Sequence, residues 1–256
     1  MVTEGSYPIL EFDPSPQALM EPSELIAPQD VPEHCVLCFF AEVISGLAEA
    51  GRARQVACLR SEMGQHPIYE MEFEGRALAL FHPRVGAPLA AASLEGLIAI
   101  GCRKFVACGG AGVVQPGVPC GRLIVPVAAV RDEGTSYHYL PPAREVEASR
   151  EAVGAITSVL ERHGCQYILA KTWTTDAFYR ETPARIARRR AEGCVTVEME
   201  AAALFAVAQF RGVPLAQILY GGDDCSGAEW DSREWHLRGT VREELLWLAA
   251  EACLRL

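Results

Sequence analysis

The segment 197–203 reads Val-Glu-Met-Glu-Ala-Ala-Ala and places two carboxylates around a methionine, directly before a very apolar stretch. The carboxylates are Glu198 and Glu200, and the methionine is Met199. A carboxylate can accept hydrogen bonds from two vicinal hydroxyl groups, and it can stabilise positive charge that develops on a ribosyl ring. A carboxylate is also favoured electrostatically at the N-terminus of a helix. The segment therefore predicts either a carboxylate that faces a sugar or a helix cap, and the residue types leave both interpretations open.

A glycine-rich run, Gly-Gly-Ala-Gly at residues 109–112, follows an apolar segment that is typical of a buried strand. Glycine allows a tight turn and lets the backbone approach another group closely. We expect Gly109 and Gly110 to form a turn, either alone or beside a ligand. A dinucleotide fingerprint is excluded, because Gln115 stands where the GxGxxG spacing needs its last glycine. The sequence also lacks a GxxxxGK[ST] phosphate loop, an HExxH motif and a GxSxG motif.

Segments typical of strands alternate with segments typical of helices along most of the chain. We expect strands at residues 36–40, 55–59, 68–73, 77–81, 104–108, 123–130, 167–171 and 215–220. We expect helices at residues 42–50, 89–100, 151–163, 183–191, 199–210 and 241–254. This alternation predicts a single α/β domain over residues 34–256, with a mixed, mostly parallel central sheet flanked by helices. Ligands of such sheets bind at the carboxyl ends of the strands.

Residues 1–33 are rich in proline and acidic residues and show no clean periodicity. They predict an irregular N-terminal arm, in a position to pack against a neighbouring subunit. The first residues lack the features of a signal peptide, and no apolar run reaches the roughly 20 residues of a membrane span. We therefore expect a cytoplasmic protein.

Charge and cysteine usage restrict the partners. The formal net charge of −10 argues against a general nucleic-acid or membrane-surface binder, so we expect neither partner. The ten cysteines are scattered, which predicts free thiols. Cys35 and Cys38 form a CxxC within a predicted strand, and no second cysteine pair completes a zinc site. We expect no metal and no cofactor.

The order of several short motifs resembles the nucleoside phosphorylase superfamily, especially its uridine-phosphorylase-like and nucleosidase branches, from about Val36 to the C-terminus. The motifs are Val85-Gly86-Ala87-Pro88, Leu94-Glu95, Gly109 to Gly112, Thr175-Asp176-Ala177-Phe178-Tyr179, Val197 to Ala203, and Gly222-Asp223-Asp224. Each is a weak signal alone, but together they are specific. The resemblance implies the α/β fold already expected, and a homo-oligomer that is a dimer, a trimer or a hexamer.

The resemblance also implies roles for individual residues. Glu200 would hold the ribose hydroxyls, and Met199 would pack under the sugar. Phe178 would stack on the base or lie against its edge. Asp223 would donate a proton to the departing base, because a nucleobase anion is a poor leaving group. Without the resemblance, Asp223 and Asp224 are equally well explained as a solvated pair in a loop.

Four further residues complete the binding site that the resemblance implies. Glu198 and Tyr179 lie beside the residues named above, and Gly109 and Gly110 would bring the backbone close to the substrate. The Glu198 carboxylate keeps its alternative as a helix cap.

The phosphate ligands of typical phosphorylases are absent at the matching positions. The family uses a Gly-Asp-Pro turn with an arginine after the first strand, where this chain has residues Cys38 to Glu42. It also uses an arginine and a hydroxyl residue where this chain has Ala107 and Gly110. Because phosphate binding depends on guanidinium and hydroxyl donors, this departure puts phosphorolysis in doubt. Arg84 is the predicted replacement.

Glu42 suggests a different acceptor. Nucleosidases of the superfamily carry a glutamate after the first strand that activates water, and Glu42 can be placed at that position. The alternative is an ordinary glutamate at a helix N-terminus.

His138 lies in a loop dense in polar and aromatic residues, and it would either contact the substrate or remain a surface histidine.

The uracil-recognising glutamine and arginine of uridine phosphorylases are missing as well, and Arg180 or Arg185 would have to compensate.

Taken together, the motifs predict an enzyme that cleaves the N-glycosidic bond of a small-molecule nucleoside. Phosphorolysis to free base and ribose 1-phosphate is preferred slightly, with phosphate as a co-substrate. The alternatives are hydrolysis by Glu42-activated water and nucleoside binding without catalysis.

Overall fold

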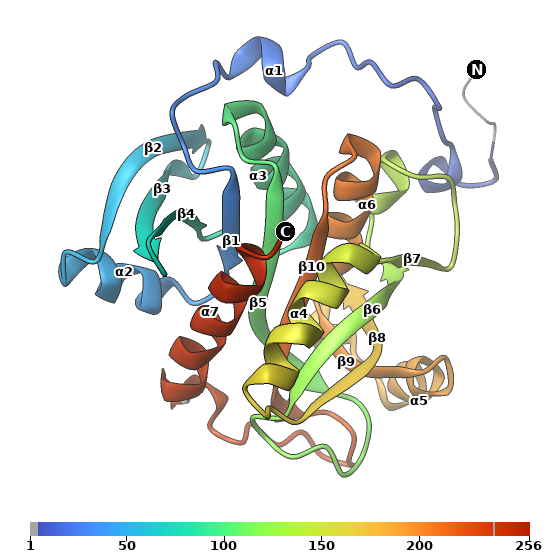
Figure 1. The fold of residues 1–256 in the computed structure, drawn as a ribbon. Coiled ribbons are helices and arrows are strands. Elements are labelled where there is room, and N and C mark those ends of the chain that lie inside the picture. Colours follow the sequence, from blue (N-terminus) through green and yellow to red (C-terminus); the bar gives the residue numbers. More distant parts are fainter. Residues whose placement is uncertain (1–4, 238) are drawn as a thin grey trace.

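A computed structural model describes residues 5–237 and 239–256 of the chain (Figure 1). Ten strands form one mixed sheet: β1 (His34–Cys38), β2 (Ala53–Ser61), β3 (Gly64–Phe73), β4 (Arg76–Phe81), β5 (Lys104–Val113), β6 (Leu123–Asp132), β7 (Glu145–Glu147), β8 (Tyr167–Thr175), β9 (Cys194–Glu198) and β10 (Leu215–Asp224). The helices are α1 (Pro22–Leu25), α2 (Ala41–Glu49), α3 (Ala87–Ile100), α4 (Arg150–Arg162), α5 (Pro183–Ala191), α6 (Ala201–Arg211) and α7 (Gly239–Cys253). Four short 3-10 helices are η1 (Pro8–Leu10), η2 (Ser136–His138), η3 (Phe178–Arg180) and η4 (Trp235–Leu237). The predicted single α/β fold with a large mixed sheet is confirmed.

The sheet curls back on itself in one half and stays open in the other. Strands run in the order β10-β6-β8-β9-β5, and β10 also pairs with β5, which closes this half. The order continues from β5 through β1, β4 and β3 to β2. Strands β1, β5 and β10 are parallel, so their carboxyl ends share one edge. Strand β9 meets β5 only at its last residues, where Val197 lies opposite Gly112. The curl therefore brings the end of β9 to that same edge.

The glycine run differs from its prediction. Gly109 to Gly112 do not form a turn, because β5 continues through them to Val113. A Cβ atom on Gly110 would lie 3.0 Å from a ring carbon of Tyr220, and one on Gly112 would lie 3.0 Å from Val197 Cγ1. The glycines allow neighbouring strands and side chains to approach closely at the curl.

The helices cover the sheet in packed pairs. Helices α4 and α7 pack together, and Figure 1 shows them in front of the sheet, while α3 and α6 form a second pair. Helix α6 is buried from Ala201 to Ala208, which explains why its sequence is apolar on every side. The predicted helices are confirmed with small shifts at their ends, and strands β7 and β9 are additions.

The N-terminal arm crosses the top of the molecule in Figure 1 before it enters β1. Glu21 accepts a hydrogen bond from Arg211 at 3.1 Å, and the backbone N–H of Gln29 donates to the carbonyl of Ile100 at 2.8 Å. The described part of the arm thus packs against α3 and α6 of its own chain. Residues 1–4 of the predicted arm lie outside the described residues.

Metal and membrane features were searched in residues 5–237 and 239–256. No group of three or more histidine, cysteine, aspartate or glutamate side chains there could hold a metal ion. No helix in the same ranges is long and apolar enough to cross a membrane. All ten cysteines are free thiols, and the CxxC residues Cys35 and Cys38 are both buried.

Candidate active site

A cavity of about 900 Å³ lies where the ends of β1, β5, β9 and β10 meet. Seven of the residues predicted from the sequence line it: Gly110, Phe178, Tyr179, Glu198, Met199, Glu200 and Asp223. They come from four separate stretches of the chain. Gly109, Glu42, Arg84 and His138 are not among the lining residues.

Glu200 is one of two buried carboxylates that line the cavity. Only 6% of its surface is exposed, and its Oε1 accepts a hydrogen bond from the backbone N–H of Gly86 at 2.6 Å. Gly86 immediately precedes α3, so the Val85-Gly86-Ala87-Pro88 motif is what meets the second glutamate of the 197–203 segment. Burial, and next the charge of Glu198, raise the pKa of Glu200 to about 8. A buried carboxyl group can accept hydrogen bonds from the hydroxyl groups of a ligand in place of water.

Glu198 lines the cavity but acts as the cap of α6. Its Oε2 accepts the backbone N–H groups of Glu200 at 2.8 Å and Ala201 at 2.6 Å, and its Oε1 accepts the hydroxyl of Thr174 at 2.6 Å. Burial raises its pKa to about 7 despite these donors. Glu198 thus caps the helix, as one interpretation of the 197–203 segment predicts, and Glu200 lines the cavity, where its contact with a sugar stays a prediction.

Asp223 belongs to a group of carboxylates at one end of the cavity. Its Oδ2 accepts the indole N–H of Trp230 at 2.7 Å and the thiol of Cys225 at 3.5 Å. The Cys225 thiol also lies 3.7 Å from Oε2 of Glu181. Burial, followed by the charge of Asp223, raises the pKa of Glu181 to about 7. Asp224 is different, since it pairs with Arg233 and its carboxylate accepts the N–H of Ser226 at 2.8 Å.

Phe178 and Tyr179 form the rim of the same end. Their ring centroids lie 4.1 Å apart, and 50% of Phe178 and 88% of Tyr179 remain exposed. Two aromatic faces at the mouth of a cavity can cover a flat ring that enters between them and the carboxylates. Met199 directly precedes Glu200 in the sequence. Its side chain is partly buried on the cavity wall. Its thioether adds apolar contact beside the buried carboxylate.

The wall of the cavity also carries an arginine that sequence reasoning missed. Arg242, in the first turn of α7, lies with its guanidinium carbon 4.7 Å from the ring centroid of Phe40, and its Nε is buried without a hydrogen-bond partner. Its Nη1 pairs with Oε1 of Glu42 at 3.0 Å. Phe40 and Gly110 also line the cavity, and they lie in the segments where the resemblance places the phosphate ligands of typical phosphorylases. The arginine thus supplies a cation at that place from a distant part of the chain.

Gln217 is a second buried polar group at the cavity. It lies on β10 with 1% of its surface exposed, and its Oε1 has no hydrogen-bond partner. An unsatisfied buried amide oxygen is unfavourable unless a ligand or water reaches it. The sequence itself marks this residue as unusual, because Gln217 interrupts the otherwise apolar run Leu215 to Tyr220.

Glu42 and Arg84 are engaged with protein groups. Glu42 is half exposed beside Arg242 and lies in the first turn of α2, which fits its alternative as a helix N-terminal residue. Arg84 donates through Nε to Nδ1 of His66 at 3.1 Å. The structure therefore does not bring Arg84 to the cavity.

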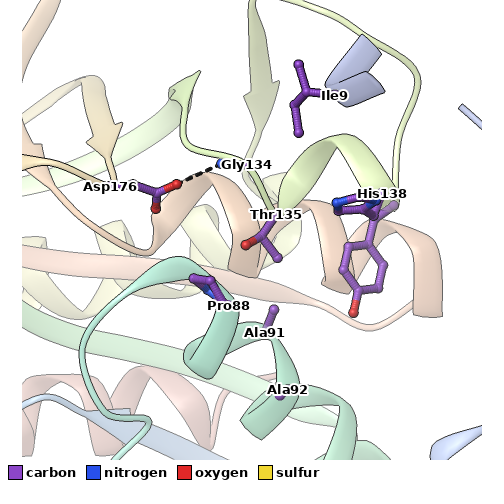
Figure 2. A pocket seen from close by; sticks show the side chains of 9 residues that line it. Ile9, Pro88, Ala91, Ala92, Gly134, Thr135, His138 and Asp176 are labelled. Carbon is purple, nitrogen blue, oxygen red and sulfur yellow. Dashed lines mark hydrogen bonds between the residues drawn. The ribbon is translucent and has the colours of Figure 1, made fainter. Parts of the chain in front are cut away.

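His138 lines a second, open cavity of about 540 Å³, shown in Figure 2. Thr135, Pro88 and Ile9 of the N-terminal arm lie around it, and Asp176 accepts the N–H of Gly134 at 2.9 Å at its edge. The histidine is exposed on η2. Its predicted contact with the substrate of the first cavity has no support in this placement.

The fold and the cavity together define an α/β protein with a ligand site at the carboxyl ends of its strands. The chain belongs to the phosphorylase superfamily, whose family model matches residues 33–254.

Two relatives of known activity are similar over part of the chain. A uridine phosphorylase of Thermococcus kodakarensis is 33% identical over 127 residues, which are 50% of this chain and 44% of that protein. A guanosine phosphorylase of Halorubrum lacusprofundi is 29% identical over 180 residues, which are 66% of this chain and 73% of that protein. The chain thus matches less than half the length of the Thermococcus protein.

Solved structures show the same fold over nearly the whole chain. An AMP nucleosidase of Bacteroides thetaiotaomicron superposes with a TM-score of 0.71 at 24% identity and covers 87% of each chain. A uridine phosphorylase of Vibrio fischeri gives a TM-score of 0.73 at 23% identity, covering 91% of this chain and 97% of the other. The proteins similar to this chain are thus nucleoside phosphorylases and a nucleosidase.

Proposed function

We propose that this enzyme cleaves the N-glycosidic bond of a nucleoside by phosphorolysis, giving the free base and ribose 1-phosphate. The observation that carries the proposal is the cavity itself. Its wall carries the buried carboxylate of Glu200, the carboxylate of Asp223 with the aromatic rings of Phe178 and Tyr179, and the guanidinium group of Arg242. These three kinds of group match the sugar, the base and an anionic acceptor. The activities of the similar proteins support the same reaction class.

The reaction divides among these groups. The bond between C1′ and the base nitrogen breaks, and its electron pair goes to the base. The side-chain carboxyl group of Asp223 supplies a proton to the base. Positive charge develops on the ribosyl ring, where the ionised form of Glu200 would stabilise it while accepting the ribose hydroxyls. A phosphate oxygen then forms the new bond to C1′. Phe178 and Tyr179 would cover the base.

Arg242 supports phosphate as the acceptor. A guanidinium group is the preferred donor to phosphate oxygens, and the buried Nε of Arg242 has no other partner. The neighbouring turn of Phe40 presents aromatic surface and no competing anion except Glu42. Phosphate would have to displace Glu42 from Arg242 or share the arginine with it.

Hydrolysis is the second candidate, and Glu42 is the observation that favours it. The Glu42 carboxylate already neutralises Arg242, so the arginine does not require phosphate as a counter-ion. The same carboxylate could orient a water molecule near C1′. The sugar product and two variants distinguish phosphate from water as the acceptor. Phosphorolysis predicts ribose 1-phosphate only when phosphate is added, and Arg242→Gln should raise the KM for phosphate about tenfold or more. Hydrolysis predicts free ribose without phosphate and loss of activity in Glu42→Gln.

The role of Glu200 is tested by Glu200→Ala. Removing the group that holds the sugar should reduce kcat/KM for any accepted nucleoside by about 10²-fold or more. Glu49→Ala, which removes an exposed carboxylate at the end of α2, is the matched control. Equal activity of the two variants would contradict the proposed sugar site.

A further inference from the structure

Glu181 is a cavity carboxylate without a role in the reaction described so far. It follows η3 and precedes α5, and it reaches the end of the cavity that holds Asp223. It is only partly exposed, and the charge that most affects it is that of Asp223. Two carboxyl groups therefore lie near one another on the wall of the cavity.

Cys225 connects the two carboxyl groups. Its sulfur lies 3.7 Å from Oε2 of Glu181 and 3.5 Å from Oδ2 of Asp223. Burial and these two carboxylates raise the pKa of the thiol, so it keeps its hydrogen and can donate it to one carboxylate at a time. Trp230 donates a second hydrogen bond to Asp223 at 2.7 Å. Asp223 therefore accepts hydrogen bonds from both Cys225 and Trp230.

A pair of this kind holds a proton near neutral pH. The pKa of Glu181 is raised to about 7 by burial and by Asp223. Like charges at short range disfavour double ionisation, and the proton belongs to the pair as a whole. The pair thus presents one hydrogen-bond donor and one acceptor to the cavity.

We propose that Glu181 and Asp223 act together as a donor–acceptor pair that selects a base with an acceptor ring nitrogen beside an exocyclic amino group, as in adenine. This inference rests on the proposed function and specifies its substrate class. The edge of adenine that carries N7 offers an acceptor at N7 and a donor at the 6-amino group, which matches the pair. A proton given to N7 also neutralises the departing base, because N7 and N9 share one ring.

A 6-oxopurine does not fit the same pair. Its N7 and O6 are both acceptors, so one of them would face an ionised carboxylate. A second proton would be needed to satisfy both atoms, and the single shared proton does not supply it. Glu181 would therefore be the residue that distinguishes adenosine from inosine.

The test compares kcat/KM for adenosine and inosine in the wild-type protein, Glu181→Gln, Glu181→Asp and the exposed control Glu243→Gln. The wild type should prefer adenosine, and Glu181→Gln should reduce the adenosine-to-inosine ratio by about 10-fold to 100-fold, the range for a hydrogen bond to a charged group. Glu181→Asp, which keeps the carboxyl group, should retain most of the preference. Glu243→Gln should behave as wild type. Thermal melting of each variant separates a specificity change from misfolding.

Two results would overturn the inference and leave the proposed function standing. They are a wild-type preference for inosine, and an adenosine-to-inosine ratio that Glu181→Gln does not change. Release of no base from any nucleoside would instead overturn the proposed function, and this inference with it.

Discussion

Replacing Asp223 by asparagine tests the protonation step separately from folding. The asparagine oxygen can still accept the indole N–H of Trp230, which donates to Asp223 at 2.7 Å, so the loop should keep its position. What the variant loses is the carboxyl group and its charge. Proton transfer from a positioned side chain contributes about 10²-fold to 10⁴-fold, which is about 3–5 kcal/mol of transition-state stabilisation. We therefore expect kcat/KM for adenosine to fall by that factor.

The assay uses two substrates and one control variant. Base release is measured with adenosine and with 7-methyladenosine, whose base departs neutral without a proton. Asp223→Asn should lose less than about tenfold on the methylated substrate, because proton transfer is then not required. Asp224→Asn is the control, since Asp224 lies outside the cavity and pairs with Arg233. An equal loss of Asp223→Asn on both substrates would refute proton donation and indicate a structural role.

Three further predictions follow from the buried carboxylates and the chain's assembly. Glu198→Ala should lower the free energy of unfolding by about 2–4 kcal/mol in urea denaturation, because two N–H groups of α6 lose their acceptor; no change would contradict the capping role. The pKa of Glu200 is raised to about 8 from an ordinary value near 4.5, so the folded state binds more protons and the melting temperature should fall between pH 5 and pH 8.5; Glu200→Gln should flatten this dependence, and an unchanged slope would count against it. Light scattering should give a dimer, trimer or hexamer, and a monomer at micromolar concentration would contradict the expected homo-oligomer.

The elements and the cavity carboxylates Glu198 and Glu200 could be predicted because their signals are local. Alternating apolar segments fix the order of strands and helices, and the 197–203 segment carries its two carboxylates within one junction. The glycine run was misjudged because glycine marks a turn and a close approach equally well. Only the partners Tyr220 and Val197, which come from other strands, show that a close approach is the cause.

The rest of the site depends on contacts between distant segments. Arg242 reaches Phe40 across about two hundred residues of sequence, so no local pattern marks it as a cavity cation. Glu181 appears in the sequence as one charged residue among several before α5, and only the fold places it beside Asp223. Arg189 shows the opposite case. The run Arg188 to Arg190 is typical of a solvated helix face, but Arg189 is buried and pairs with Asp132 at 3.1 Å.

Product release by the wild-type protein shows whether the enzyme cleaves an N-glycosidic bond and which acceptor it uses. The protein is incubated with adenosine, inosine, uridine and 5′-methylthioadenosine, each with and without phosphate, and the free base and the sugar product are measured by chromatography. The account predicts release of a free base together with ribose 1-phosphate, or its 5′-methylthio counterpart, only when phosphate is present. Intact nucleosides in every mixture, from a protein that is folded and assembled, would contradict the claim that this cavity cleaves the N-glycosidic bond.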